Sequence, residues 1–535
     1  MGDPLSEDDW FGSQPEVIVA LYKYQSRLDL RLGDLYGERN RKGRVEGVGA
    51  GGMHALVYYR PGDFRVLDGR PIFYTSNDLV IKVSLVHRCG TDVRYHREGH
   101  RLIDSVLLTQ LGDLTGLNGS FDTANLKEYV DLLETGIANK GVKDELYWSL
   151  AGHVKRLAER ERDGFSKGLF REWGRITGHE MVGTVERVGS NVKNLTQPLG
   201  YTATWLSRLP MEYLDFREGE RVILQTRCAQ YRAPPESLQK GNAAGIQLLG
   251  MDIEDGARTI DGGFAQYVRV TPELIRSGCV IRVPDSISDT EAALVEPAAC
   301  LVDCLDLAVH PEGQDEKGNM MKKGVRRDGV TVIVGSGAMA FIAAELALTV
   351  DEKMQVGGAS KVIMFVRSEE KAVLGERLLG SRFGGKIEYF VYDSNQPHQE
   401  NVRRFVEEYG KSSTVDDVVV AAGDSRAVEL AHRLVSGTGW RIHAFAGTRG
   451  DISVESGVWH YSNAGTSGTS GCNTRAMGNV LRMIERGTIE LSRFSGNKYA
   501  FSDLERDTSR FFVDRYLRPA LLPNEDKSDV EWLEE

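Results

Sequence analysis

The sequence predicts an α/β protein in which a β-rich domain with a helical insertion precedes a doubly wound parallel sheet. From residue 331 onward, short β-branched runs alternate with helical stretches, an order that is typical of βαβ units. Residues 54–83 instead hold two β-rich runs with the turn pairs Pro61-Gly62 and Asp68-Gly69 between them. Between residues 101 and 171, apolar side chains recur at helical spacing.

The composition excludes several classes of protein. Of the 535 residues, 41% are hydrophobic and 27% are charged, and the net charge is −11, so the chain is globular and an unlikely ligand for nucleic acid or for an anionic membrane surface. No apolar run is long enough to span a bilayer, and the first ten residues are acidic instead of resembling a signal peptide. The six cysteines are scattered, as in a reducing compartment. We therefore expect a cytoplasmic protein.

The first element along the chain is an extension that ends in the glycine-rich run Gly47–Gly52, which predicts a flexible linker. The strands expected beyond residue 331 are Thr331–Val334, Val362–Val366, Ile387–Tyr392, Val418–Val420 and Arg441–Phe445. The predicted order is an extension over 1–52, a β-rich domain over 53–305 with an insert over 101–171, a parallel-sheet domain over 306–455, and a return to the β-rich domain over 456–535.

The insert carries two apolar stripes, which comprise Leu126, Tyr129, Val130, Leu133 and Ile137, and Leu146, Leu150, Val154 and Leu157. Such stripes belong to amphipathic helices that pack on a core. A lid or a subunit contact would present the same pattern. The sequence leaves both interpretations open.

A glycine turn follows the first strand of the parallel sheet. Gly335 and Gly337 open the pattern G-x-G-x-x-A, which ends at Ala340. Gly335 permits the tight turn, Gly337 lets a pyrophosphate approach the backbone, and the helix beginning near Ala338 and Met339 offers partial positive charge. The strand before and the helix after the turn favour dinucleotide binding over a purely structural turn.

The end of the second strand distinguishes the two nicotinamide dinucleotides. A carboxylate there would bind the ribose hydroxyls of NAD, whereas an arginine would face the 2′-phosphate of NADP. Here Arg367 and Ser368 close the strand and favour NADP. Glu369 and Glu370 follow at once and leave NAD open.

Four residues offer the ligand types of a catalytic zinc. Cys89, His179 and Glu180 could bind the ion and leave one position open, while Glu296 holds a water or enters the coordination shell. Each residue also has a purely structural interpretation. Cys89 could be a small buried apolar group, His179 a hydrogen-bonded loop residue, Glu180 a capping acid and Glu296 an acid in a first helical turn.

Taken together, the motifs resemble those of the zinc-dependent medium-chain dehydrogenase/reductase superfamily of alcohol and polyol dehydrogenases. They occur in the family's order: Met53–Val66, Cys89–Asp92, Gly178–Gly183, Val185–Gly189, Gly219–Val222, Gly262–Tyr267, Val295–Pro297 and the glycine turn. The resemblance implies a GroES-like catalytic domain beside a Rossmann domain, zinc and NAD or NADP as cofactors, and a homodimer or homotetramer.

The resemblance also implies roles for single residues. Cys89, His179 and Glu180 correspond to zinc ligands and Glu296 to the exchangeable fourth ligand, while Thr91 corresponds to a relay hydroxyl and Asp92 to the partner that orients the histidine. Two departures stand out. Arg94 occupies the position of a proton-passing histidine, with His96 nearby, and Cys228 is the only cysteine where relatives carry a four-cysteine zinc lobe, so we expect one zinc per chain.

The implied activity is the interconversion of a secondary alcohol and a ketone on a small-molecule polyol, sugar or sugar phosphate. Within the superfamily the chain resembles the L-sorbose-1-phosphate reductases, through Glu296-Pro297 with Cys300 and through Gly465–Gly468 with Asn473. An amino alcohol, a simple secondary alcohol or an aryl alcohol is the alternative substrate. A nucleotide-binding sensor without turnover is the alternative from another class of function.

Overall fold

The computed structural model divides the chain into two compact units. Unit 1 comprises residues 1–282, 498–514 and 519–535, and unit 2 comprises residues 283–497 and 515–518. The structure describes residues 45–48, 53–60, 63–70, 73–98, 175–195, 214–229, 246–249, 258–315, 318–351, 356–393, 395–409, 414–448, 452–454 and 457–525. The predicted insert over 101–171 and most of the predicted extension over 1–52 lie outside these residues.

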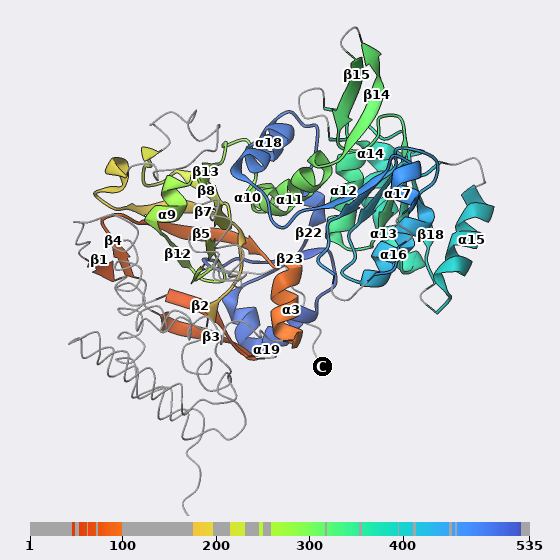
Figure 1. Cartoon of the computed structure of the whole chain (residues 1–535). Coiled ribbons are helices and arrows are strands. Elements are labelled where there is room, and N and C mark those ends of the chain that lie inside the picture. The colour runs from red at the N-terminus through yellow and green to blue at the C-terminus, as the bar shows by residue number, and fades with distance from the viewer. Residues whose placement is uncertain are drawn as a thin grey trace, which may run out of the picture. The chain divides into compact units, whose positions relative to one another are not determined.

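The largest sheet of unit 1 is built around β5 (Leu79–His87), whose side chains are nearly all buried. Its strand order is β13 (Val280–Arg282), β8 (Arg221–Leu224), β7 (Glu180–Val188), β5, β23 (Arg518–Leu521) and β22 (Ser495–Tyr499), and β12 (Tyr267–Val270) also pairs with β5. The pairs formed by β5 are antiparallel. Because β23 comes from the C-terminal end of the described chain, this sheet joins segments that are far apart in sequence (Figure 1).

A smaller antiparallel sheet of β3 (Asp63–Arg70), β2 (Met53–Arg60) and β6 (Arg175–Ile176) completes the core of unit 1. The helix α19 (Phe501–Val513) packs on β2 and β3 and buries Phe511 and Phe512. The remaining described elements of the unit are β1 (Val45–Val48), β4 (Phe73–Thr75), α3 (Gly90–Glu98), the 3-10 turn η2 (Val192–Asn194), β9 (Arg227–Ala229), β10 (Ile246–Leu249), β11 (Arg258–Ile260) and α9 (Pro272–Arg276). The strand β1 pairs with β4, so Gly47 and Val48, expected in a linker, belong to a strand.

Unit 2 contains a parallel sheet in the order 3-2-1-4-5-6. Its strands are β18 (Ile387–Val391), β17 (Lys361–Val366), β16 (Val330–Val334), β19 (Asp417–Val420), β20 (Arg441–Ala444) and β21 (Gly465–Gly468). All five neighbouring pairs are parallel. This order is that of a doubly wound dinucleotide-binding sheet, with the switch point between β16 and β19.

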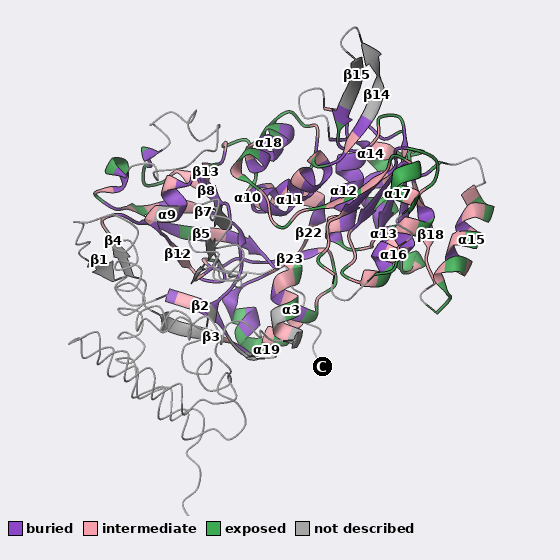
Figure 2. Cartoon of the chain, in the orientation of Figure 1, coloured by how far each residue is buried: buried purple, intermediate pink, exposed green. Residues whose placement is uncertain are grey.

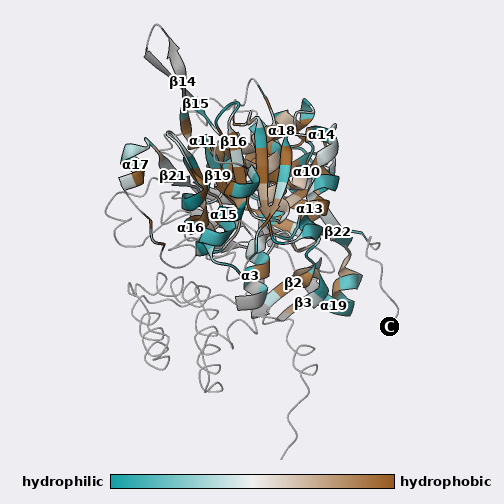
Figure 3. Ribbon diagram, turned by 90° about the vertical axis from the view of Figure 1, so that its right-hand side faces the viewer, coloured by the Kyte–Doolittle hydropathy of each residue, from teal (hydrophilic) through white to brown (hydrophobic). Residues whose placement is uncertain are grey.

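Helices flank the parallel sheet and bury its central strands β16, β17 and β19, which are purple in Figure 2 and largely brown in Figure 3. The edge strands β18 and β21 are only partly buried. The helices α15 (His398–Tyr409) and α16 (Ser425–Leu434) share a core with alternate residues of the strands, while α12 (Ala338–Leu348) packs on β16 and β17. The other helices of unit 2 are α10 (Asp289–Ala293), α11 (Val295–Asp306), α13 (Glu369–Gly375), the π turn η5 (Glu376–Gly380), α14 (Ser381–Phe383), α17 (Gly457–Tyr461), α18 (Thr474–Glu485) and the 3-10 turn η6 (Ser492–Phe494).

The structure confirms the predicted fold class, a parallel doubly wound sheet together with a β-rich domain of largely antiparallel strands. Two elements of unit 2 stand out among those that we did not predict. One is the hairpin of β14 (Val309–Asp315) and β15 (Gly318–Lys323), which projects from unit 2 (Figure 1), and the other is the edge strand β21. Among the described residues, no helix has the length and hydropathy needed to cross a bilayer.

Candidate metal centre and dinucleotide turn

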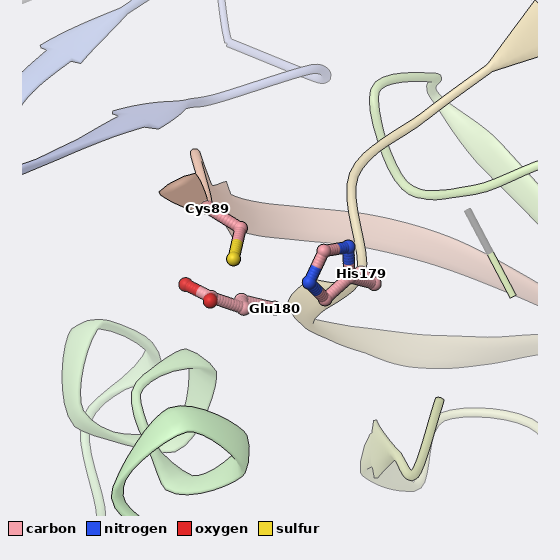
Figure 4. Close-up of side chains that lie close together, drawn as sticks. All are labelled: Cys89, His179 and Glu180. Atoms are coloured by element: carbon pink, nitrogen blue, oxygen red, sulfur yellow. The ribbon is translucent and has the colours of Figure 1, made fainter. Parts of the chain in front are cut away.

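Two neighbouring strands of unit 1 bring the predicted metal ligands together. Cys89 follows β5, while His179 and Glu180 stand at the start of β7. The strands are antiparallel, and the Cα pairing places His87 opposite Glu180. The end of one strand therefore lies beside the beginning of the other, and the three ligand side chains converge there (Figure 4).

The three side chains fit a transition-metal ion. The Cys89 thiol, the His179 imidazole and the Glu180 carboxylate each offer a ligand atom, and these atoms lie within 4.8 Å of one another. His179 and Glu180 are buried and Cys89 is half-buried. A thiol, an imidazole and a carboxylate form a donor set typical of zinc, and three protein ligands leave a position open, as in catalytic sites.

Asp92 joins the backbones of the two segments that carry the ligands. One carboxylate oxygen accepts the Cys89 N–H at 2.8 Å, and the other accepts the Gly178 N–H at 3.3 Å. Burial raises the pKa of Asp92, although the neighbouring His179 and the hydrogen bond from Cys89 act to lower it. Asp92 therefore fixes the backbone on both sides of the candidate metal ligands, whereas the resemblance implies that it orients the ligand histidine.

The Gly262–Ala265 stretch runs along the residues that directly precede His179 and forms backbone hydrogen bonds with them. Gly263 donates its N–H to the Gly178 carbonyl at 2.7 Å, and Phe264 donates to Thr177 at 3.0 Å. Gly178 has φ of +87°, and a Cβ there would lie 2.8 Å from the Phe264 ring, which is fully buried. The residue before His179 must therefore be glycine, both for its backbone conformation and for space.

The predicted relay hydroxyl of Thr91 lies on α3 after Cys89, together with His96 and with Arg94, which stands at the position where the family's proton-passing histidine is missing. Thr91 is half-buried in the first turn, and Arg94 is exposed. The His96 ring stacks on the Phe512 ring, with centroids 4.6 Å apart and an interplanar angle of 11°. His96 thus contributes to packing between α3 and α19.

Glu296 belongs to unit 2, where it lies with Cys300, which the sequence analysis named beside it, and with Cys472, which it did not. The ligand atoms of Glu296, Cys300 and Cys472 are within 4.8 Å of one another. The Cys300 thiol donates a hydrogen bond to Glu296 Oε1 at 3.5 Å. The contact with Cys472, burial and the Glu296 charge together hold the pKa of Cys300 well above its usual value. The spacing of four residues between Glu296 and Cys300 was the available hint, since it places both on one helical face.

The glycine turn has the local geometry of a dinucleotide site. Gly335 has φ of +151°, and a Cβ there would lie 3.2 Å from the Ala340 side chain. A Cβ at Gly337 would meet no atom within 4 Å, so the backbone is open to a ligand at this point. Ala338 and Met339 are the first two residues of α12, whose first N–H groups have no partner within the helix.

The predicted ribose-binding pair lies where β17 ends. Arg367 is exposed, and Ser368 caps α13, with its hydroxyl oxygen accepting the Lys371 N–H at 3.4 Å. The positive charge of Arg367 contributes to lowering the pKa of Asp424, a smaller effect than the hydrogen bond to Asp424 from Arg426. Arg367 thus lies among charged groups at the carboxyl edge of the parallel sheet, where a doubly wound sheet binds its ligand.

A buried polar cluster in unit 2 was not predicted. His310 and His443 each hydrogen-bond through Nε2 to the same oxygen of Asp417, at 2.9 and 2.8 Å, and the other oxygen accepts the Arg326 N–H. Burial alone would raise the pKa of Asp417, but the hydrogen bonds and charges of the two histidines lower it to about 2. The three residues are 107 and 26 positions apart in sequence, so no local motif could indicate the cluster.

Comparisons with solved structures show that zinc-dependent dehydrogenases have the same fold. A zinc-dependent alcohol dehydrogenase of Streptococcus pneumonia matches with 16% identity and a TM-score of 0.53, over 89% of this chain and all of its own. The chain has the fold of these dehydrogenases. Galactitol-1-phosphate dehydrogenase of Escherichia coli matches with 14% identity and a TM-score of 0.53, over 88% of this chain and 100% of its own.

A third match is a protein of Sinorhizobium meliloti assigned as a zinc-binding dehydrogenase and solved with NADP. It shares 17% identity with a TM-score of 0.53, over 88% of this chain and 99% of its own. At the level of sequence, no family model matches the chain, and no curated protein does. The resemblance inferred from the ordered motifs is thus matched at the level of fold.

Proposed function

We propose that the chain is a zinc-dependent NAD(P) oxidoreductase that interconverts a secondary alcohol and a ketone on a polyol, sugar or sugar phosphate. The observation that carries this proposal is the convergence of Cys89, His179 and Glu180 at two paired strand ends. Three protein ligands leave one coordination position of the ion open for a substrate. In a protein that also contains a dinucleotide-binding turn, such a site fits a zinc-dependent oxidoreductase.

In this mechanism Cys89, His179 and Glu180 hold the zinc, and Asp92 holds the backbones of Cys89 and Gly178 in place. When bound, zinc would serve as a Lewis acid for the substrate oxygen, and the dinucleotide would serve as the hydride acceptor or donor. The half-buried Thr91 would relay the proton: its hydroxyl accepts the proton of the substrate hydroxyl while passing its own proton to solvent, and the reverse occurs in the reductive direction.

The glycine turn binds the dinucleotide, with the pyrophosphate at the start of α12 and the 2′-phosphate of NADP at Arg367 and Ser368. Structures that share the fold were solved with NADP in one case and with NADH in another, so the choice of NADP rests on Arg367 and Ser368. A sugar phosphate is the favoured substrate, because the chain resembles L-sorbose-1-phosphate reductases and shares its fold with galactitol-1-phosphate dehydrogenase. A homodimer or homotetramer and a cytoplasmic location are further parts of the proposal.

The test is a nicotinamide absorbance assay on the zinc-loaded protein with ketoses, polyols and their phosphates, using both cofactors. We expect turnover with NADP(H) and its loss in Cys89→Ala, while Cys279→Ser, a buried cysteine of the same unit, stays active. Gly337→Val should fold normally but bind the dinucleotide weakly, because its side chain would enter the space open to the ligand. Absence of turnover across the panel, with metal and dinucleotide both bound, would favour the non-catalytic sensor.

A further inference from the structure

The second group of candidate ligands in the described part of the chain is formed entirely by unit 2. Glu296 and Cys300 lie one turn apart on α11, so they share a helical face. Cys472 reaches them from the segment that precedes α18. Their ligand atoms lie within 4.8 Å of one another, and the Cys300 sulfur is 3.5 Å from Glu296 Oε1. Glu296 is buried and the two cysteines are half-buried, so the group is enclosed but accessible to an ion.

Hydrogen bonds hold the segment of Cys472 against α11. The Asn473 backbone N–H donates to Asp303 at 2.8 Å, and its side-chain amide donates to both Asp303 oxygens at 2.9 and 2.7 Å. The Asn473 side chain also caps α18 by accepting the Ala476 N–H at 2.9 Å. On the other side of Cys472, Thr469 hydrogen-bonds with Cys304. Cys472 is therefore held between two anchors on the helix that carries the other two ligands.

Two thiols and a carboxylate favour a thiophilic ion, unlike a site made of oxygen ligands alone. Thiolate ligands select thiophilic ions such as zinc, and tetrahedral coordination by three protein ligands leaves one position for water or a small ligand. Binding would release the two thiol protons to solvent. The resulting thiolates and the Glu296 carboxylate would more than balance the charge of a divalent ion.

We propose that Glu296, Cys300 and Cys472 form a second binding site, within unit 2, for a thiophilic divalent cation such as Zn²⁺. This site goes beyond the proposed function and does not depend on the Cys89 set being catalytic. It also changes the expected metal content. The sequence predicts one zinc per chain because the four-cysteine lobe is missing, whereas this site would bind a second ion through cysteines outside that lobe.

The experiment is a cobalt titration of the full-length chain under a non-chelating phosphine reductant, because Co²⁺ occupies zinc sites and gives a near-ultraviolet charge-transfer band with thiolates. Cys89→Ala combined with His179→Ala removes the first ligand set. In that background we expect one equivalent of Co²⁺ to bind with the thiolate band, and further substitution by Cys300→Ser and Cys472→Ser to abolish the band. The wild-type chain should bind one equivalent more than the background variant.

Three further variants in the same background separate the site from a general loss of structure. Cys279→Ala is the control, since Cys279 is a buried cysteine of unit 1 that lies outside the ligand group, and it should keep the band. Glu296→Gln should bind Co²⁺ about tenfold or more weakly, as expected for the loss of a ligand. Asn473→Ala should also weaken binding, while circular dichroism stays unchanged.

Two results would overturn the proposal. One is a background variant that is folded by circular dichroism but gives no thiolate band. The other is a band that survives replacement of both Cys300 and Cys472. Neither depends on turnover, so a failure of the proposed oxidoreductase activity would leave this measurement intact. Conversely, an active wild-type enzyme whose background variant gives no thiolate band would refute the second site alone.

Discussion

Asp92 acts at the scale of a single residue, through the backbone of the two segments that it joins. Its two oxygens accept the N–H groups of Cys89 and Gly178, which lie on either side of the gap between the ends of β5 and β7. A carboxylate in this position stabilises the ligand geometry without contacting the ion. Its effect should therefore be on metal affinity more than on folding.

We expect Asp92→Ala to weaken zinc binding by about 10- to 100-fold, the usual consequence of losing a group that orients metal ligands. Competition with a chromophoric chelator measures the affinity. Asp503→Ala is the control, because Asp503 is also a buried carboxylate of unit 1 and accepts the Ala500 N–H at 2.7 Å. That change should lower stability and leave zinc affinity unaltered. Equal zinc affinity in Asp92→Ala and wild type would refute the orienting role.

Asp417 makes a prediction about stability at low pH. The two histidines lower the pKa of Asp417 from 3.8 to about 2 in the folded protein. Between these two pH values the unfolded chain binds a proton at this residue and the folded protein does not. The free energy of unfolding therefore decreases as the pH falls from 3.8 to about 2. The loss should amount to about 2 kcal/mol. Urea unfolding between pH 4 and pH 2 measures it. Asp417→Asn should be less stable at pH 7 and should lose this part of the pH dependence; an unchanged slope would contradict the assignment.

Single residues also mark how far the sequence could predict the site. Cys89, His179 and Glu180 were predictable, because each lies in a local motif and the motifs occur in a recognisable order. The grouping of Glu296 with Cys472 was not, because it depends on how the segment before α18 packs on α11 through Asp303. Side chains that meet only through tertiary packing leave no pattern in the sequence around them.

At the scale of elements, hydrogen bonding between residues 176–178 and residues 262–264 positions the start of β7. Three backbone hydrogen bonds form it: Gly262 to Ile176, Gly263 to Gly178 and Phe264 to Thr177. Phe264 fills the space beside Gly178 completely. These contacts with residues 262–264 therefore fix the backbone conformation of the residues that precede His179.

Two glycines with nearly equal φ angles can separate the effect of packing against Phe264 from the effect of backbone strain. Gly178 has φ of +87° and faces the Phe264 ring, whereas Gly219 has φ of +90° and open space around its missing Cβ. Gly219→Ala should cost about 1–2 kcal/mol from backbone strain alone. Gly178→Ala should cost at least about 3 kcal/mol, because overpacking adds to that strain. Urea midpoints of the two variants measure the difference; similar destabilisation would mean that Phe264 can move aside.

The sheet elements show which strands a sequence can predict. The five strands expected in the parallel sheet all exist, because runs such as Val362–Val366 are β-branched and fully buried. The sixth, β21, escaped because Gly465–Gly468 consists of small residues. Its pairing with β20 is what makes it a strand. An edge strand needs less burial and so carries a weaker pattern.

At the scale of the whole molecule, unit 1 is discontinuous in sequence. The strand β23 pairs with β5, placing Ala520 opposite His87 and Leu521 opposite Val86. The same end of β5 pairs with β7 on its other side. The end of β5 that precedes Cys89 is therefore paired on both sides only when β23, from the last described segment of the chain, has joined the sheet.

Truncation after Asn497 should consequently abolish zinc binding, although residues 89, 179 and 180 remain. The loss of β23 leaves Val86 and His87 of β5 without their partner strand, and the loss of α19 removes Phe511 and Phe512 from the core. Dinucleotide binding should persist, because almost all of unit 2 lies within 283–497. Equilibrium dialysis with zinc and fluorescence titration with NADPH measure the two. Retained zinc affinity would show that β23 is dispensable.

The return of the chain to β5 also has a consequence for synthesis on the ribosome. Unit 2 has nearly all of its residues once Asn497 has emerged, whereas unit 1 still awaits residues 498–521 for its sheet and core. Domains fold as units while the chain is made, so the nascent chain should acquire a dinucleotide-binding surface before its metal ligands are set. Zinc would then be bound by unit 1 only after residues 498–521 have emerged, later than the dinucleotide-binding surface forms.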